Sequence, residues 1–265
     1  MVNFLLIVKT LETTNIDVRG LGQVVVDPAT IEVGNNAVVA RCRVEGLRGY
    51  KTIKCYNTQG HRADTKSVKH YPQSLAVYGF SGRVEYIDVA ISRWIDGRAL
   101  DVVFYSGGCD FRALSSEFDK MALRHLQCGI VHGDIKPENI IVLKSGKMML
   151  IDSDELPTNV EGNYQAKDYG SEHYAHPLRR LRRTDIYTDH YPLAFTSSLL
   201  AALVFEPTLF DTRRSIEEYI AMAADVLAEH NDTCHYNLIE AMSKSIIGKV
   251  EGIESLFESI VMADK

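Results

Sequence analysis

The sequence lacks the cysteine pattern of a disulfide framework or of a zinc site. Its 265 residues include five cysteines, an odd number, and no two of them form a CxxC pair. Scattered single cysteines of this kind are typical of reduced thiols in a cytosolic protein. We therefore predict a cytoplasmic protein without a structural zinc ion.

A long apolar segment and an excess of basic residues are also missing. The apolar run at residues 4–8 is too short for a membrane span or for the core of a signal peptide. The net charge is −6, with 46% hydrophobic and 24% charged residues. This composition is that of an ordinary globular protein and gives no reason to expect nucleic acid as a partner. The length allows one large domain or two small lobes, and it leaves the oligomeric state open.

The most informative stretch covers residues 130–154 and reads IVHGDIKPENIIVLKSGKMMLIDSD. Apolar runs at Ile140–Leu143 and at residues 148–151 flank the turn sequence KSGK, which predicts a β-hairpin. Such a hairpin would bring Asn139 and Asp152 close together, with Asp134 five residues before Asn139. Carboxylate and amide oxygens suit Mg²⁺ carried by a nucleotide. The stretch therefore predicts a magnesium–nucleotide site.

HGDIKPEN and the following IDSD resemble the HRDxxxxN and DFG motifs of the protein-kinase superfamily. The resemblance implies an α+β fold in a single domain, residues 1–265, with a small antiparallel β-rich N-lobe (1–96) and a larger helical C-lobe (97–265). It implies ATP and Mg²⁺ as cofactors. Asp134 would orient the acceptor hydroxyl and accept its proton, and Lys136 would neutralise the transferred phosphoryl group. The implied metal ligands are Asn139 and Asp152.

The expected N-lobe begins with residues 1–28, which are compatible with an extra strand or a short helix. Turn residues then separate three β-rich segments, which predicts an antiparallel meander, at residues 31–33, 36–44 and 50–56. Lys54, in KTIKCY, stands where the family places its ATP-binding lysine. Gly34 and Asn36 stand in the phosphate-covering loop, where only one of the family's three glycines remains. Trp94, in ISRWIDGRAL, would either lie at the adenine pocket of the hinge or pack in the core or against the hinge.

The expected C-lobe is helical. An amphipathic repeat predicts a helix over residues 111–126, and later apolar repeats predict helices at 215–229, 236–247 and 253–262. His132 is interpreted as a packed core histidine rather than a metal ligand. Asp189 precedes the apolar run at 193–204 and matches the aspartate with which the family anchors its catalytic loop.

Departures from the family pattern leave three functions open. Lys136, together with Ser171 in a segment similar to the acceptor-cradling GTxxYxAP, resembles Ser/Thr protein kinases. Gly133 in place of the HRD arginine, and an acidic sequence at 152–155 in place of DFG, resemble aminoglycoside, choline and sugar kinases. The absence of a glutamate between residues 45 and 85 to pair with the ATP-binding lysine suits a pseudokinase that acts as a binding module. We favour a Ser/Thr protein kinase; a protein or small-molecule hydroxyl acceptor is expected, and its identity stays open.

Overall fold

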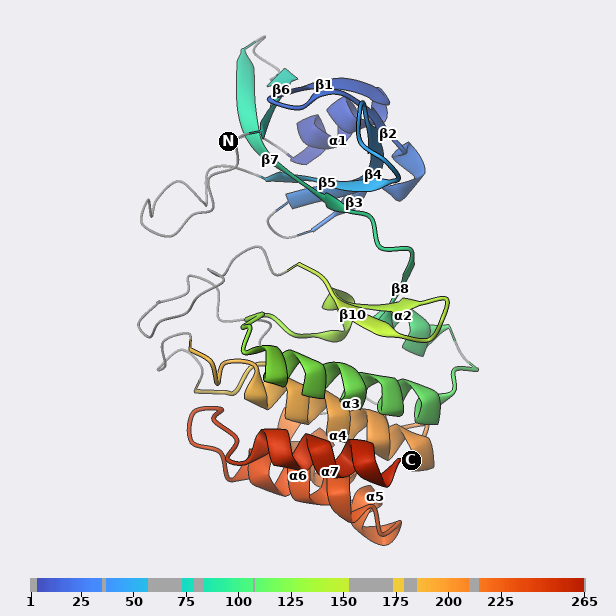
Figure 1. Ribbon diagram of the computed structural model, residues 1–265, viewed down its shortest axis with the longest axis vertical. Helices are drawn as coiled ribbons and strands as arrows, with labels where there is room; N and C mark the ends of the chain where they lie inside the picture. The colour runs from blue at the N-terminus through green and yellow to red at the C-terminus, as the bar shows by residue number, and fades with distance from the viewer. Residues whose placement is uncertain are drawn as a thin grey trace. The chain divides into compact units, whose positions relative to one another are not determined.

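The computed structural model describes residues 4–34, 37–56, 73–78, 83–106, 108–152, 174–178, 185–209 and 215–264. The chain divides into two units, Met1–Ile95 and Asp96–Lys265. The first is rich in antiparallel β-structure and the second is largely helical (Figure 1). The chain is therefore an α+β protein, as predicted. The boundary expected from the sequence lies one residue further along.

The N-terminal unit is a six-stranded antiparallel barrel. Its elements are α1 (Phe4–Glu12), β1 (Asn15–Arg19), β2 (Gly22–Val26), η1 (Pro28–Thr30), β3 (Glu32–Val33), β4 (Ala37–Val44), β5 (Lys51–Tyr56), β6 (Gln73–Tyr78) and β7 (Val84–Arg93). The strand order is β2-β1-β6-β7-β5-β4-β3. Because β2 also pairs with β4, the six strands from β2 to β4 in this order form the closed barrel, and β3 is added at the edge of β4. The predicted meander corresponds to β3, β4 and β5. Residues 1–28 contain both a helix and two strands.

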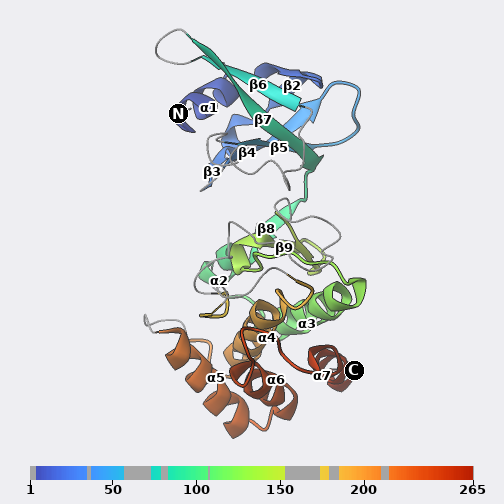
Figure 2. The ribbon, with the colours of Figure 1, turned by 90° about the vertical axis from the view of Figure 1, so that its left-hand side faces the viewer.

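Alternation of side chains along the strands fills the barrel. On β4, Val38, Ala40 and Cys42 point inward and are almost fully buried. Helix α1 adds Ile7 and Leu11, which lie one helical turn apart and therefore share a face. Both side chains are fully buried against the strands, and α1 lies against the barrel in Figure 2.

The C-terminal unit combines a small sheet with a helical bundle. Its elements are β8 (Gly97–Ala99), α2 (Leu100–Tyr105), α3 (Phe111–Cys128), η2 (Pro137–Asn139), β9 (Ile140–Leu143), β10 (Met148–Leu150), α4 (His190–Phe205), α5 (Ile216–Glu229), α6 (Thr233–Ser243) and α7 (Ile253–Ala263). β10, β9 and β8 form an antiparallel sheet in that order. Strands β9 and β10 are the predicted hairpin. Helix α6 begins three residues before its predicted start because Asp232 caps it, accepting a hydrogen bond from the backbone N–H of His235.

Helix α4 is the centre of the bundle. Every residue from His190 to Leu203 is buried, because α3, α5 and α6 pack around it. A helix that is apolar on all sides needs such an enclosed position. The arrangement also places Asp189, at the start of α4, in the interior, where it is 2% exposed. Within the residue ranges given above, every helix is too short or too polar to span a bilayer.

Candidate phosphotransfer site

The loop between α3 and η2 carries the first group of predicted site residues. Helix α3 ends at Cys128, because the next residue, Gly129, has a left-handed φ of 62°. The loop then turns at Gly133, with a φ of 85°, and enters the short 3-10 helix Pro137–Asn139. Asp134, Lys136 and Asn139 therefore lie on one compact loop.

Asp134, Lys136 and Asn139 contact one another directly. The Nζ of Lys136 lies 2.7 Å from Oδ2 of Asp134. The side-chain amide of Asn139 donates to the Asp134 carbonyl at 2.8 Å and to Oδ2 of the same residue at 3.1 Å. Two donors thus hold one oxygen of the Asp134 carboxylate, whose side chain remains 32% exposed. The carboxylate is oriented and still accessible to a small acceptor group.

Asp152 follows β10 and lies beside Asn139, as the hairpin predicted. The backbone N–H of Ile151 donates to the Asn139 carbonyl at 2.9 Å, which joins the two ends of the hairpin. Asp152 itself has a φ of 66°, in the left-handed region that few residues other than glycine occupy. Such a conformation costs on the order of 1 kcal/mol or more and is often retained at functional sites. The strain falls on the residue predicted to hold the metal.

Asn139 and Asp152 are donors of the kind that suits Mg²⁺ carried by a nucleotide. The described ranges contain no group of three or more His, Cys, Asp or Glu side chains that could hold an ion. Asn139 and Asp152 supply two oxygen ligands, and magnesium commonly takes one or two protein ligands together with phosphate oxygens and water. The residues present therefore fit a cation that arrives with ATP.

The buried carboxylate of Asp189 is hydrogen-bonded to the backbone of this loop. Asp189 accepts hydrogen bonds from the backbone N–H of His132 at 2.5 Å and of Gly133 at 2.8 Å. The Nε2 of His125 donates to the same carboxylate at 2.8 Å. Burial alone would raise the pKa of Asp189, but the hydrogen bonds from His125 and from the two backbone groups outweigh it, so this pKa is lowered. The anchoring role that the resemblance implied for Asp189 has these contacts as its physical basis.

His132 connects the loop to the strand that ends at Asp152. Its ring is buried, as predicted, with the residue 4% exposed. Nε2 donates to the Ile151 carbonyl at 2.7 Å, and Nδ1 accepts from the backbone N–H of Asp134 at 3.3 Å. His125, the other ring in this network, was not found from the sequence. No local pattern marks it, because its partner Asp189 lies 64 residues away.

Three of the predicted nucleotide-binding residues, Lys54, Gly34 and Trp94, lie on or beside strands of the N-terminal unit. Lys54 is paired in register with Val39 of β4 and Ala90 of β7. Its neighbours Ile53 and Cys55 are buried in the barrel, so Lys54 belongs to the outer face, with Nζ 5.3 Å from the centre of the Tyr56 ring. Lys51, three residues earlier, belongs to the opposite face.

Gly34 and Trp94 border the same sheet. The backbone N–H of Gly34 donates to the Ala37 carbonyl at 2.9 Å, which closes the turn between β3 and β4. Trp94 follows β7, donates its backbone N–H to Tyr50, and lies with its ring 5.7 Å from the Arg41 guanidinium. Its buried indole N–H has no acceptor in the part of the chain that the structure describes. The assignments of Lys54, Gly34 and Trp94 to a nucleotide site remain predictions.

Some predicted features lie outside the described residues: Asn36, Ser171, and the segment at 57–72 that lacks the helix glutamate. The end of the segment that resembles GTxxYxAP, residues 174–178, is described and packs on α4. The Tyr174 ring packs edge-on against Phe195, with ring centroids 5.8 Å apart, and the His176 ring packs edge-on against Tyr191, with centroids 5.1 Å apart. Burial raises the pKa of Tyr174, and the nearby Glu138 carboxylate adds to this increase. The phenol therefore stays neutral at physiological pH.

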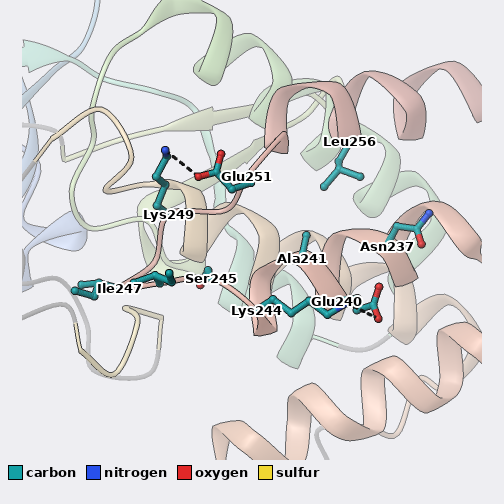
Figure 3. A pocket seen from close by; sticks show the side chains of 10 residues that line it. Asn237, Glu240, Ala241, Lys244, Ser245, Ile247, Lys249, Glu251 and Leu256 are labelled. Atoms are coloured by element: carbon teal, nitrogen blue, oxygen red, sulfur yellow. Dashed lines mark ion pairs between the residues drawn. The ribbon is translucent and has the colours of Figure 1, made fainter.

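A separate groove of about 750 Å³ lies between α6, the following loop and α7 (Figure 3). Its lining residues are Asn237, Glu240, Ala241, Lys244, Ser245, Ile246, Ile247, Lys249, Glu251 and Leu256. Two ion pairs lie at its rim, Lys244 with Glu240 and Lys249 with Glu251, each at 2.9 Å. None of the predicted site residues lines this groove.

Comparison of the chain with models of known protein families and with curated proteins found no match.

Proposed function

We propose that the chain is an ATP- and Mg²⁺-dependent phosphotransferase with a two-lobed protein-kinase-like fold, which transfers the γ-phosphate to a Ser or Thr hydroxyl of a protein. The observation that carries the proposal is the cluster of Asp134, Lys136 and Asn139 on one loop, with Lys136 2.7 Å from Asp134. Asp152 lies beside Asn139 at the end of the hairpin. These contacts support the roles in catalysis and metal binding that the resemblance implied for the four residues.

The residues divide the work of phosphoryl transfer between them. Asp134, held by Asn139 and Lys136, orients the acceptor hydroxyl and takes up its proton. The Nζ of Lys136, 2.7 Å from this carboxylate, can neutralise negative charge that develops there. Asn139 and Asp152 would hold the metal, and Lys54 the phosphates. Bound Mg-ATP would supply the phosphoryl group and its counter-ion.

The choice of a protein acceptor rests on two features of the C-terminal unit. Lys136, two residues after Asp134, is the catalytic-loop lysine of the Ser/Thr protein kinases that the chain resembles. The segment at 174–178 packs on α4 through Tyr174 and His176, which gives a firm base to the chain that would cradle an extended acceptor. A fixed segment of this kind suits a polypeptide better than a small, fully enclosed molecule.

A small-molecule acceptor is the second candidate, and Gly133 favours it. This residue has a φ of 85° and its backbone N–H is held by Asp189. A side chain here would be strained, so an arginine that docks a regulatory phosphate does not suit the loop. The same HGD sequence resembles aminoglycoside, choline and sugar kinases. A pseudokinase, the third reading, would keep the fold and bind nucleotide without consuming it.

The test is transfer from ATP labelled at the γ-phosphate, with and without Mg²⁺. We expect Asp134→Asn to keep Mg-ATP binding and to slow transfer by about 10²–10⁴-fold, the usual effect of losing a positioned base. Asp152→Ala should keep the fold and lose the thermal stabilisation by Mg-ATP. Asp225→Asn, at an exposed position on α5, is the matched control. Transfer by Asp134→Asn within a few-fold of wild type would contradict the assignment.

The acceptor class can be read from the same assay. Cell lysate is separated into fractions of large and small molecules, and each fraction is incubated with the enzyme and γ-labelled ATP. Label on a polypeptide supports the protein kinase, whereas label on a small molecule supports the second candidate. Binding of Mg-ATP without consumption in any fraction would indicate the pseudokinase.

A further inference from the structure

A buried charged cluster joins three helices of the C-terminal unit. It shares no residue with the loop that carries Asp134, Lys136 and Asn139. At its centre is His235, in the first turn of α6, with its side chain 11% exposed. Nδ1 lies 2.8 Å from Oδ2 of Asp232, and Nε2 lies 3.2 Å from Oδ2 of Asp119 on α3. Both ring nitrogens therefore face a carboxylate oxygen.

The two carboxylates have further partners that fix their positions. Asp119 is 2% exposed and accepts a hydrogen bond at 2.5 Å from the Ser197 hydroxyl of α4. Asp232 caps α6 by accepting from the backbone N–H of His235. The cluster thus ties together α3, α4 and the first turn of α6.

The geometry selects the protonated ring. A neutral imidazole has one N–H and one acceptor nitrogen, so one carboxylate would face a lone pair at hydrogen-bond distance. The Asp119 charge would then be buried without a cation, which is costly. An imidazolium donates from both nitrogens and satisfies both oxygens.

The charges around His235 act in the same direction. Burial by itself would lower the pKa of His235, but hydrogen bonds to Asp119 and Asp232 and the charges of these carboxylates raise it to about 9. Arg112 of α3 acts on Asp232, and α4 contributes the neutral hydroxyl of Ser197. Within the described residues, neither α5 nor α7 adds a charged group to those that set this pKa.

We propose that His235 is a permanently protonated clamp at neutral pH, and that its charge, more than the packing of its ring, fastens α6 to α3 and α4. Helix α6 also supplies Asn237, Glu240 and Ala241 to one wall of the groove in Figure 3, and Lys244 follows at its C-terminal end. The clamp therefore holds that wall in place. Loss of the proton would loosen α6, which carries none of the predicted phosphotransfer residues Asp134, Lys136 and Asn139.

The expected pH dependence follows from the sign of the shift. The pKa is higher in the folded chain than the ordinary 6.5, so the stabilisation is complete below pH 6.5 and is lost as the pH rises through about 9. For the full-length chain, we expect the unfolding equilibrium constant to increase by roughly 10²–10³-fold over this window, beyond the effect of other groups. His235→Gln should remove most of this increase. His230→Gln, which alters a ring stacked on Phe205, is the matched control and should leave it unchanged.

Two measurements separate a charged clamp from simple packing. In the wild-type chain, ¹⁵N NMR of the His235 ring at pH 7.5 should show both nitrogens protonated; a neutral ring would overturn the proposal even if the variants fail to fold. A double-mutant cycle compares His235→Gln, Asp119→Asn and the double variant. The double variant should increase the unfolding equilibrium constant by much less than the product of the two single-variant increases. Effects that simply multiply would mean that the two side chains do not interact.

Discussion

Replacement of Asp189 by asparagine removes one charge from the interior and keeps the shape of the side chain. The carboxylate is 2% exposed and accepts from His125 and from the backbone of His132 and Gly133. An asparagine has a single acceptor oxygen, so at least one buried backbone N–H loses its partner, at a cost of about 1–3 kcal/mol. The bonds that remain are no longer charge-assisted and weaken by about 1 kcal/mol each. We expect a loss of about 3–5 kcal/mol in the free energy of unfolding.

The same substitution has a signature in acid. The pKa of Asp189 is lower in the folded chain than the ordinary 3.8, so its stabilisation is present above pH 3.8 and is lost as the pH falls through the folded value. Denaturant unfolding between pH 3 and pH 7 should therefore show a smaller acid-dependent loss for Asp189→Asn than for wild type. Asp225→Asn, at an exposed site, serves as the control.

Phosphoryl transfer should fall as well, because Asp189 holds the two residues that precede Asp134. A displacement of about 1 Å in a catalytic group can cost about 10²-fold in rate. We expect kcat to decrease by about this factor while KM for ATP changes less, as measured by initial rates with γ-labelled ATP. The reasoning is refuted if Asp189→Asn unfolds within about 0.5 kcal/mol of wild type, a change typical of surface sites, and transfers phosphate normally.

Three further predictions, two of them with a control variant, test the strand, helix and lysine assignments. Gly97→Ala would place a Cβ against a methyl group of Ile141 in β9, closer than van der Waals contact allows, so we expect denaturant unfolding to show a loss of about 1–3 kcal/mol. Gly34→Ala, whose Cβ would lie 3.4 Å from the Ala37 carbonyl oxygen, should cost much less. Ser215→Ala removes the capping box of α5 and should lower the free energy of unfolding by about 1 kcal/mol; no measurable loss would contradict the cap. Lys54→Met should raise KM for Mg-ATP, and Lys51→Met, on the opposite strand face, should not; equal effects would remove Lys54 from the nucleotide site.

The local features of this protein follow from its sequence. The β9–β10 hairpin could be predicted because two short apolar runs flank a turn that contains Gly146, so neighbouring residues decide its geometry. The contact of Asp134 with Asn139 is equally local, since a single 3-10 turn separates them. Helix α3 is found within two residues of its predicted end because its apolar period stops at Gly129.

Tertiary structure alone decided the contacts between distant segments. No periodicity indicates that β2 pairs with β4 and β1 with β6 to close the barrel, because pairing between strands depends on the whole sheet. The partners of the buried histidines are hidden for the same reason: His125 meets Asp189 across 64 residues, and His235 meets Asp119 across 116. An isolated histidine or aspartate in a sequence carries no sign of its partner. Only the packing of α3, α4 and α6 brings these side chains together.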